Sequence, residues 1–117
     1  MGKLTTHVLD TYHGKPAQGL TIELYKIDND NKSHIKTIQT NEDGRNPAPL
    51  LEGQQVEAGI YELVFHAGDY FEKLGVSLAE PRFLDRIPLR FGIAAPTENY
   101  HVPLLVTPWT YSTYRGS

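Results

Sequence analysis

Cysteine is missing from the 117 residues of this chain. Its absence excludes disulfides, thiolate metal ligands and a cysteine nucleophile together. Apolar runs long enough to span a membrane, about 18–20 residues, are also missing, so no membrane partner is expected. Residues 1–7 lack the apolar stretch of a signal peptide. This predicts a cytoplasmic protein, or a periplasmic one if a leader peptide has been removed.

A large excess of one sign of charge is missing as well. The formal net charge is −3, and no block of like charges occurs. A nucleic-acid binder usually presents a basic face, so no nucleic-acid partner is expected. Charged residues make up 21% and hydrophobic residues 39% of the chain, which is typical of a globular protein. The length is close to the commonest domain size, and residues 1–117 are predicted to form a single domain.

The chain does contain a series of short alternating runs separated by turn residues, which is typical of an all-β protein. In Arg86–Ile93, alternate residues from Ile87 onward share one apolar face. Pro88 cannot donate a ladder hydrogen bond, which predicts an edge strand or a locally broken pairing there. The other runs that predict strands are Leu4–Leu9, Leu20–Ile27, Ser33–Thr40, Gly59–His66, Tyr100–Val106 and Trp109–Tyr114.

Turn residues and one helical segment divide these runs. Asp28–Lys32 predicts a hairpin turn, and the loop Asn41–Asn46 predicts a left-handed backbone at Gly44. Asp69–Gly75 predicts a short helix, with an aspartate at the N-cap, a glutamate three residues later and a glycine at the end. About seven or eight strands with one short helix near residues 69–75 predict a two-sheet β-sandwich.

The five histidines are the side chains that titrate nearest to neutral pH. His7 and His101 lie inside strand runs, where each is either a hydrogen-bonded core residue or a catalytic group. His13 and His34 adjoin turns and are expected to be exposed, while His66 is expected at the boundary of the core. No spacing places two histidines on one strand face as metal ligands, so no metal site is predicted.

Further polar candidates lie in a loop and at the end of the chain. Arg45 is either a solvated loop arginine or a substrate-binding group. Tyr114, Arg115 and Ser117 follow two strand runs directly, so they belong either to a solvated tail or to a site held by ordered sheet. Polar groups are placed accurately only when a rigid element holds them. The residues alone therefore predict a β-sandwich with scattered candidates for a site.

Five segments, in the same order and over nearly the whole chain, are similar to the 5-hydroxyisourate hydrolases. These are transthyretin-related enzymes of urate degradation, a branch of purine metabolism. The ending Tyr-Arg-Gly-Ser resembles the C-terminal signature of that family and is the most specific segment. Val76–Asp85 resembles the family least. The five similar segments are Leu4–Thr11, Gly14–Ala17, Thr40–Arg45, Tyr100–Leu105 and Tyr111–Ser117.

The resemblance implies a fold, an assembly and a reaction. The fold is a transthyretin-like β-sandwich, and the assembly is a homotetramer built as a dimer of dimers, with active sites in the groove between dimers. The reaction is hydrolysis of 5-hydroxyisourate at its lactam bond to 2-oxo-4-hydroxy-4-carboxy-5-ureidoimidazoline, with no metal or organic cofactor. By position, the family's site residues correspond to His7, Arg45, His101, Tyr114, Arg115 and Ser117.

These residue types suit the reaction that the resemblance implies. A water must lose a proton and a ring nitrogen must gain one, and His7 and His101, with an unperturbed pKa near ~6.5, divide that work. His7 is also expected to contact the substrate, together with Arg45, whose planar fork of donors matches the oxygens of a flat, polar ring. Ser117 is assigned to catalysis by orienting the water, which is itself the expected nucleophile.

Tyr114 and Arg115 are assigned to substrate binding. The alternative to a hydrolase is a transthyretin-like protein that binds a small ligand without catalysis. In such a protein His7, Arg45 and His101 would line the ligand channel with polar groups, whereas a hormone channel should be mostly apolar. The two functions remain distinguishable by whether the chain accelerates the decay of 5-hydroxyisourate.

Overall fold

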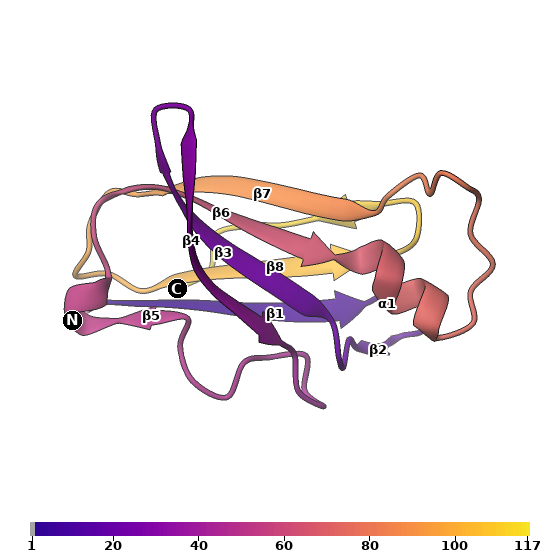
Figure 1. The fold of residues 1–117 in the computed structure, drawn as a ribbon. Coiled ribbons are helices and arrows are strands. Elements are labelled where there is room, and N and C mark those ends of the chain that lie inside the picture. Colours follow the sequence, from indigo (N-terminus) through magenta and orange to yellow (C-terminus); the bar gives the residue numbers. More distant parts are fainter. Residues whose placement is uncertain (1) are drawn as a thin grey trace.

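Two β-sheets pack face to face in the computed structural model, which describes residues 2–117 (Figure 1). One sheet has the strand order β2-β1-β8-β9, with β5 also paired to β1, and the other has the order β4-β3-β6-β7. Within the described residues the strands are β1 (Lys3–Asp10), β2 (Lys15–Pro16), β3 (Thr21–Asp28), β4 (Asn31–Gln39), β5 (Leu51–Glu52), β6 (Gly59–His66), β7 (Arg86–Ile93), β8 (Tyr100–Val106) and β9 (Tyr111–Ser112).

The core lies between the two sheets and follows from the alternation of the strands. On β1, Leu4 and Val8 are fully buried, while His7 on the opposite face of the same strand is partly exposed. The largest fully buried side chains include Tyr61 and Phe65 from β6. Inner faces that interdigitate in this way give a sandwich its core. The predicted all-β, two-sheet fold is therefore confirmed.

The strand at the end of the chain is shorter than the sequence predicts. The run Trp109–Tyr114 contains only β9, two residues long. The hydroxyl of Thr107 accepts hydrogen bonds from the backbone N–H groups of Trp109 and Thr110, which makes a turn of the residues before β9. Such side-chain bonds compete with a sheet ladder. The two-residue strands β2, β5 and β9 raise the number of strands in the described residues above the seven or eight expected.

The helix α1 (Ala67–Lys73) begins two residues earlier than predicted. Asp69 is not its N-cap, because its carboxylate binds Arg82 and Arg86 instead. The predicted end is correct, since Gly75 has the left-handed φ of 87° that favours glycine. Within residues 2–117, no helix is long and apolar enough to cross a membrane.

The long strands at the two ends of the chain lie side by side in one sheet (Figure 1). β1 and β8 pair in parallel along their whole length, from Leu4 opposite Tyr100 to Asp10 opposite Val106. In the other sheet β7 is the last strand of the order, as the proline at position 88 predicts. The parallel pair carries both strand histidines, His7 on β1 and His101 on β8.

Candidate active site

The outer face of β1 and β8 brings the two strand histidines together. Thr5 lies opposite His101 and His7 lies opposite Pro103 in the parallel register. His7 and His101 therefore project from the same face of neighbouring strands, two residues apart along the sheet. Both side chains are half-buried, so neither is a core histidine.

The loop before β5 places Arg45 beside His7. Arg45 forms an isolated antiparallel bridge with His7, and the N–H of Val8 donates to the carbonyl of Gly44 at 2.8 Å. Gly44 has a φ of 75°, and a side chain there would collide with the carbonyl oxygen of Val8. The glycine predicted at a left-handed position thus lets the backbone approach β1 closely enough to set Arg45 next to the histidines.

Each histidine is held by one hydrogen bond, through a different ring nitrogen. Nε2 of His7 lies 2.8 Å from the carbonyl oxygen of Asp43, and since a carbonyl only accepts, this nitrogen carries the hydrogen. Nδ1 of His101 lies 2.8 Å from Oγ1 of Thr5, a group that can donate or accept. Neutral His7 therefore has its lone pair on Nδ1, and His101 keeps its Nε2 for other partners.

Both imidazoles are biased toward the neutral form. Burial lowers the pKa of His7, and the nearby positive charge of Arg45 lowers it further. Burial is also the main cause that lowers the pKa of His101, followed by the charges of Arg45 and of His7. A neutral imidazole is the form that accepts a proton. The outer face of β1 and β8 therefore carries two side chains that can act as bases near neutral pH.

The tail of the chain runs along β8 and is pinned at several points. The N–H of Gly116 donates to the carbonyl of His101 at 2.8 Å, and the hydroxyl of Thr113 donates to the carbonyl of Pro103 at 2.7 Å. The guanidinium of Arg115 lies 3.1 Å from the carboxylate of Glu98 and 4.4 Å from the ring centroid of Tyr100. The tail is thus held against β8 by hydrogen bonds and is not a free end.

The predicted site residues divide into two groups by their surroundings. His7, Arg45 and His101 lie together on the outer face of β1 and β8. Tyr114 is 60% exposed and Ser117 is exposed. Arg115 is engaged with the chain itself, so in this structure it anchors the tail. Sequence reasoning missed Thr5, although the strand alternation that places His7 on the outer face places Thr5 there as well.

The groove on this face is shallow. A hollow of about 170 Å³ is lined by Thr5 and Arg45 together with the proline-containing loop after Arg45. Small-molecule sites usually enclose roughly 300–1,000 Å³, so this hollow alone covers part of such a site. Within residues 2–117, no group of three or more His, Asp or Glu side chains is placed to hold a metal ion.

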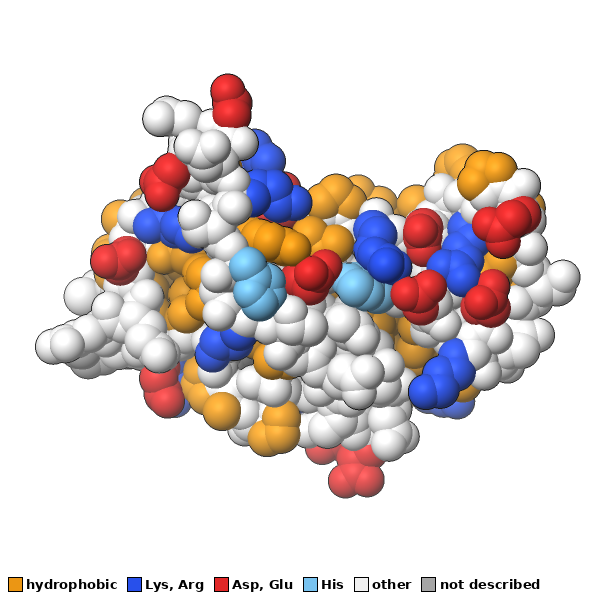
Figure 2. All heavy atoms as spheres, viewed as in Figure 1, with side chains coloured by type: hydrophobic (Ala, Val, Ile, Leu, Met, Phe, Trp, Pro, Cys, Tyr) orange, Lys and Arg blue, Asp and Glu red, His pale blue; other side chains and the backbone are white. Residues whose placement is uncertain are grey.

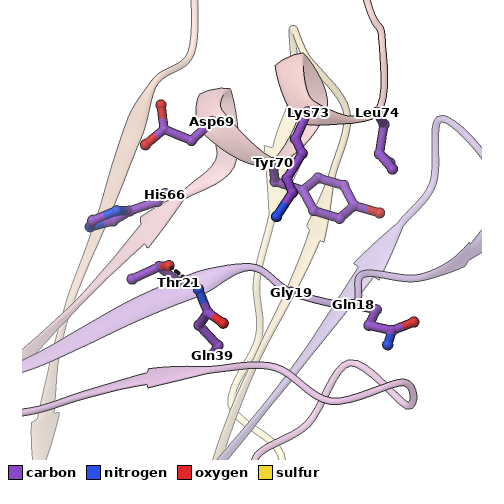
Figure 3. Close-up of a pocket in the computed structure, with 9 residues that line it drawn as sticks. All are labelled: Gln18, Gly19, Thr21, Gln39, His66, Asp69, Tyr70, Lys73 and Leu74. Atoms are coloured by element: carbon purple, nitrogen blue, oxygen red, sulfur yellow. Dashed lines mark hydrogen bonds between the residues drawn. The ribbon is translucent and has the colours of Figure 1, made fainter.

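A larger cavity of about 540 Å³ lies elsewhere, between α1 and the ends of β3 and β4 (Figure 3). The described residues that line it include none of the predicted site residues. Its polar groups are largely engaged: His66 binds Glu23 at 2.8 Å, and Tyr70 donates to Asp10 at 2.8 Å. Charges of both signs alternate on the surface near α1 (Figure 2). Size alone therefore does not identify the site.

The fold and the outer-face groove define a transthyretin-like sandwich with paired imidazoles and a guanidinium. Residues 4–116 match the HIUase/Transthyretin family, and the chain belongs to this family, as its sequence predicts. The chain is 61% identical to a 5-hydroxyisourate hydrolase of Ralstonia nicotianae over 117 residues, which is all of both chains.

Two solved structures share the whole fold. One is an (S)-allantoin synthase, with a TM-score of 0.94 and 46% identity. The match covers 99% of this chain but 44% of that longer chain. The other is sea bream transthyretin in complex with thyroxine, with a TM-score of 0.85 and 26% identity, covering 97% of this chain and 94% of that one.

Proposed function

We propose that this chain hydrolyses 5-hydroxyisourate by opening its lactam ring, and that the reaction takes place on the outer face of β1 and β8. A curated relative that matches over its full length, the one from Ralstonia nicotianae, is an enzyme of this name. The observation that carries the proposal is the set of two imidazoles and a guanidinium on one open face, formed by His7, His101 and Arg45, where burial and the charge of Arg45 lower the pKa of both histidines.

The proposed mechanism uses water as the nucleophile. A neutral imidazole takes a proton from the water as its oxygen bonds to the lactam carbonyl carbon. The guanidinium of Arg45 stabilises the negative charge that develops on the carbonyl oxygen. The carbon–nitrogen bond of the ring then breaks, and the leaving nitrogen takes its proton from an imidazolium. The products are an N–H group and a carboxylic acid, which loses its remaining proton to solvent and becomes a carboxylate, and no cofactor is needed.

The decisive experiment follows the ultraviolet absorbance of freshly prepared 5-hydroxyisourate with and without the protein. We expect the protein to accelerate the decay strongly. The His101→Asn variant serves as the matched control, because it keeps a polar side chain on β8. If the wild-type protein and this variant accelerate the decay equally, the groove is not the site of hydrolysis.

A second candidate function is binding of a small ligand without catalysis. The likeness to sea bream transthyretin in complex with thyroxine favours it. The polar groove counts against it, because a site for an apolar hormone needs mostly apolar walls. Saturable binding of thyroxine, measured by calorimetry, together with an unchanged rate of 5-hydroxyisourate decay would support this second function instead.

The family likeness also supports a homotetramer built as a dimer of dimers, with the groove shared between dimers. The hollow beside Thr5 and Arg45 is too small to enclose a ligand alone, so a second copy facing it would complete the site. Exposed aromatic side chains are typical of surfaces buried in assemblies. They include Tyr12, Trp109 and Tyr111. Light scattering should give about four times the mass of one chain, whereas a fully active monomer would contradict the shared groove.

We assign Tyr114, Arg115 and Ser117 to the edge of this site. Tyr114 and Ser117 supply hydrogen-bonding groups for substrate and water, and Arg115 holds the tail against β8. A peptide tag after Ser117 should then crowd the groove and lower kcat/KM, while a tag before Met1 should be tolerated better. Circular dichroism would confirm folding of both forms. Equal kcat/KM in the two tagged proteins would remove the tail from the site.

A further inference from the structure

The hydrogen bonds of His7 and His101 differ in what they permit. The bond from His7 Nε2 to the Asp43 carbonyl requires a hydrogen on that nitrogen. The bond between His101 Nδ1 and Thr5 Oγ1 has no such restriction, because a hydroxyl both donates and accepts. His101 can therefore keep its partner in either neutral tautomer and as an imidazolium.

One orientation of the Thr5 hydroxyl suits a complete proton cycle at His101. If the oxygen of Thr5 accepts from Nδ1–H, the neutral ring presents a lone pair at Nε2. When Nε2 takes a proton, both ring nitrogens carry hydrogen, and Nδ1–H still donates to Thr5. No group has to rotate between the basic and acidic forms, which keeps the reacting nitrogen in place.

The tail fixes the remaining side of the same ring. Backbone bonds join His101 and Gly116 in both directions, at 3.2 Å and 2.8 Å. A methyl group at position 116 would lie 3.0 Å from Cβ and 3.1 Å from Cδ2 of His101. The Gly116 backbone thus packs along the Cβ–Cδ2 edge while Thr5 holds Nδ1. Nε2 is the ring nitrogen left for substrate and water.

We propose that Thr5 is a positioning residue for the hydrolysis, which accepts a hydrogen bond from Nδ1–H of His101 and so directs the Nε2 lone pair toward the attacking water. The proposal rests on the proposed function. Nε2 takes a proton from the water, the water oxygen bonds to the carbonyl carbon, and the carbon–nitrogen bond breaks. The nitrogen released from the substrate's lactam bond then takes the proton from Nε2, which returns His101 to its starting tautomer.

Three variants test this assignment. Thr5→Val removes the hydroxyl at nearly constant volume, and Thr5→Ser keeps it. Thr11→Val is the matched control. The hydroxyl of Thr11, just after β1, also bonds to β8, since it donates to the carbonyl of Val106 at 3.2 Å, but Thr11 lies outside the groove. Loss of the partner that orients a metal-binding histidine typically costs about 10–100-fold, and we take the same range for His101. We expect kcat of Thr5→Val to fall by that factor with KM little changed, and Thr5→Ser and Thr11→Val to stay near wild type.

The pH profile of kcat distinguishes a positioning role of Thr5 from a merely structural one, because a structural role would leave this profile unchanged. The groups facing His101 that influence its charge are Arg45 and His7. Without an acceptor on Nδ1 the imidazolium is less stable, so the pKa of His101 falls and the acidic limb of kcat moves to lower pH. Nitrogen NMR of the wild-type ring should show hydrogen on Nδ1 and a bare Nε2 at a pH above that pKa.

The outcomes separate this proposal from the proposed function. If His101→Asn is inactive but Thr5→Val keeps the wild-type kcat and pH profile, the role of Thr5 is overturned and the hydrolase remains. If the NMR spectrum places the hydrogen on Nε2, the assignment is overturned whatever the activity. If the wild-type protein does not accelerate the decay of 5-hydroxyisourate, the proposed function fails. Even then, NMR that shows hydrogen on Nδ1 of His101 in wild type but not in Thr5→Val would support the contact between Thr5 and His101.

Discussion

The outer face of β1 and β8 and the cavity beside α1 both carry histidine and a cationic side chain, but their polar atoms are used differently. In the groove, His7 and His101 are bonded to uncharged oxygens and face the charge of Arg45. Beside α1, His66 binds the carboxylate of Glu23. The carboxylate of Glu23 occupies Nε2 of His66. The bond of His101 is at Nδ1 and the bond of His7 is at Nε2, so each of these rings has its other nitrogen available to exchange a proton with a substrate.

The salt-bridge network of α1 shows most clearly that charged side chains in this region stabilise the fold. Arg82 binds Asp69, Glu72 and Asp85 at 2.7–2.9 Å and ties the loop after α1 to the helix. The larger cavity borders this network. The smaller hollow is lined by Thr5 and Arg45, which adjoin His101 and His7. The chemistry of these groups, and not the volume, therefore distinguishes the proposed site.

Replacing histidines in the two regions should give the largest contrast. His7→Asn and His101→Asn should each lower kcat by roughly 10²–10⁴-fold, the usual contribution of general acid–base groups. His66→Asn is the matched control and should leave kcat near wild type, because the His66 ring is hydrogen-bonded to Glu23 near α1. Steady-state kinetics with 5-hydroxyisourate measure all three. Near-wild-type turnover in both groove variants would contradict the comparison.

Two replacements of Arg45 should separate its shape from its charge. Arg45→Lys keeps the charge but loses the planar fork, and we expect kcat/KM to fall by about 10²-fold, as for loss of an oxyanion donor. Folding stability should stay within about 1 kcal/mol, since the position is an exposed loop.

Arg45→Met also removes the charge that lowers the pKa values of His7 and His101. Removing this charge raises the pKa of both histidines, which act as bases only in their neutral form. As the pH is lowered, the methionine variant should therefore lose any residual activity at a higher pH than the lysine variant. Identical acidic limbs in the two variants would show that the charge of Arg45 does not reach the histidines.

A methyl group at position 116 should have a smaller effect. Gly116→Ala needs the His101 ring to move by a few tenths of an ångström. A misplacement of about 1 Å can cost on the order of 10²-fold, so we expect a loss nearer 10-fold in kcat. Gly92→Ala is the control, since a methyl group there lies 4.0 Å from the carbonyl oxygen of Gly59. If both variants turn over at the wild-type rate, the tail does not hold the ring.

The smallest effect on catalysis should come from Asp10, which belongs to the structural region. Its fully buried carboxylate accepts bonds from His13 and Tyr70. Burial alone would raise the pKa of Asp10, but the hydrogen bonds from His13 and Tyr70 lower it overall. Asp10→Asn should cost about 1–3 kcal/mol of unfolding free energy and leave kcat near wild type.

The pH dependence of stability follows from the same carboxylate. A carboxyl group whose pKa is lowered by folding stabilises the protein above its unfolded pKa, near ~3.9, and this contribution is lost as the pH falls through the lowered value. Urea unfolding of wild type and Asp10→Asn should therefore differ at neutral pH and converge in acid. A constant difference across that range would assign the stabilisation to packing instead of charge.

The sequence predicts the bounds of two long strands correctly, since Gly59–His66 and Arg86–Ile93 agree with the structure. Arg86–Ile93 is buried on one face and its alternation is visible, whereas residues 61–65 of the other strand are all buried. The start of α1 was wrong by two residues, because Asp69 looks like an N-cap until Arg82 and Arg86 are seen to bind it. Long-range partners of this kind leave no local pattern.

The site needed the family resemblance. Composition and spacing left His7, Arg45 and His101 as separate candidates, because their proximity depends on the parallel register of β1 and β8. Thr5 was missed for the same reason, since its partner lies in another strand. The roles of Tyr114, Arg115 and Ser117, the single domain and the cytoplasmic location stay predictions.

The parallel pairing has a consequence for how the protein is made. Thr5 and His101 are 96 positions apart, and β1 is synthesised long before β8. Until then one edge of β1 lacks its main partner and is open to pairing with other chains. Contacts of such sequence separation also slow folding. The pair of imidazoles forms only after β8 has left the ribosome. If hydrolysis takes place at the proposed site, a nascent chain that stops short of β8 has no activity, and turnover reports that synthesis went past β8.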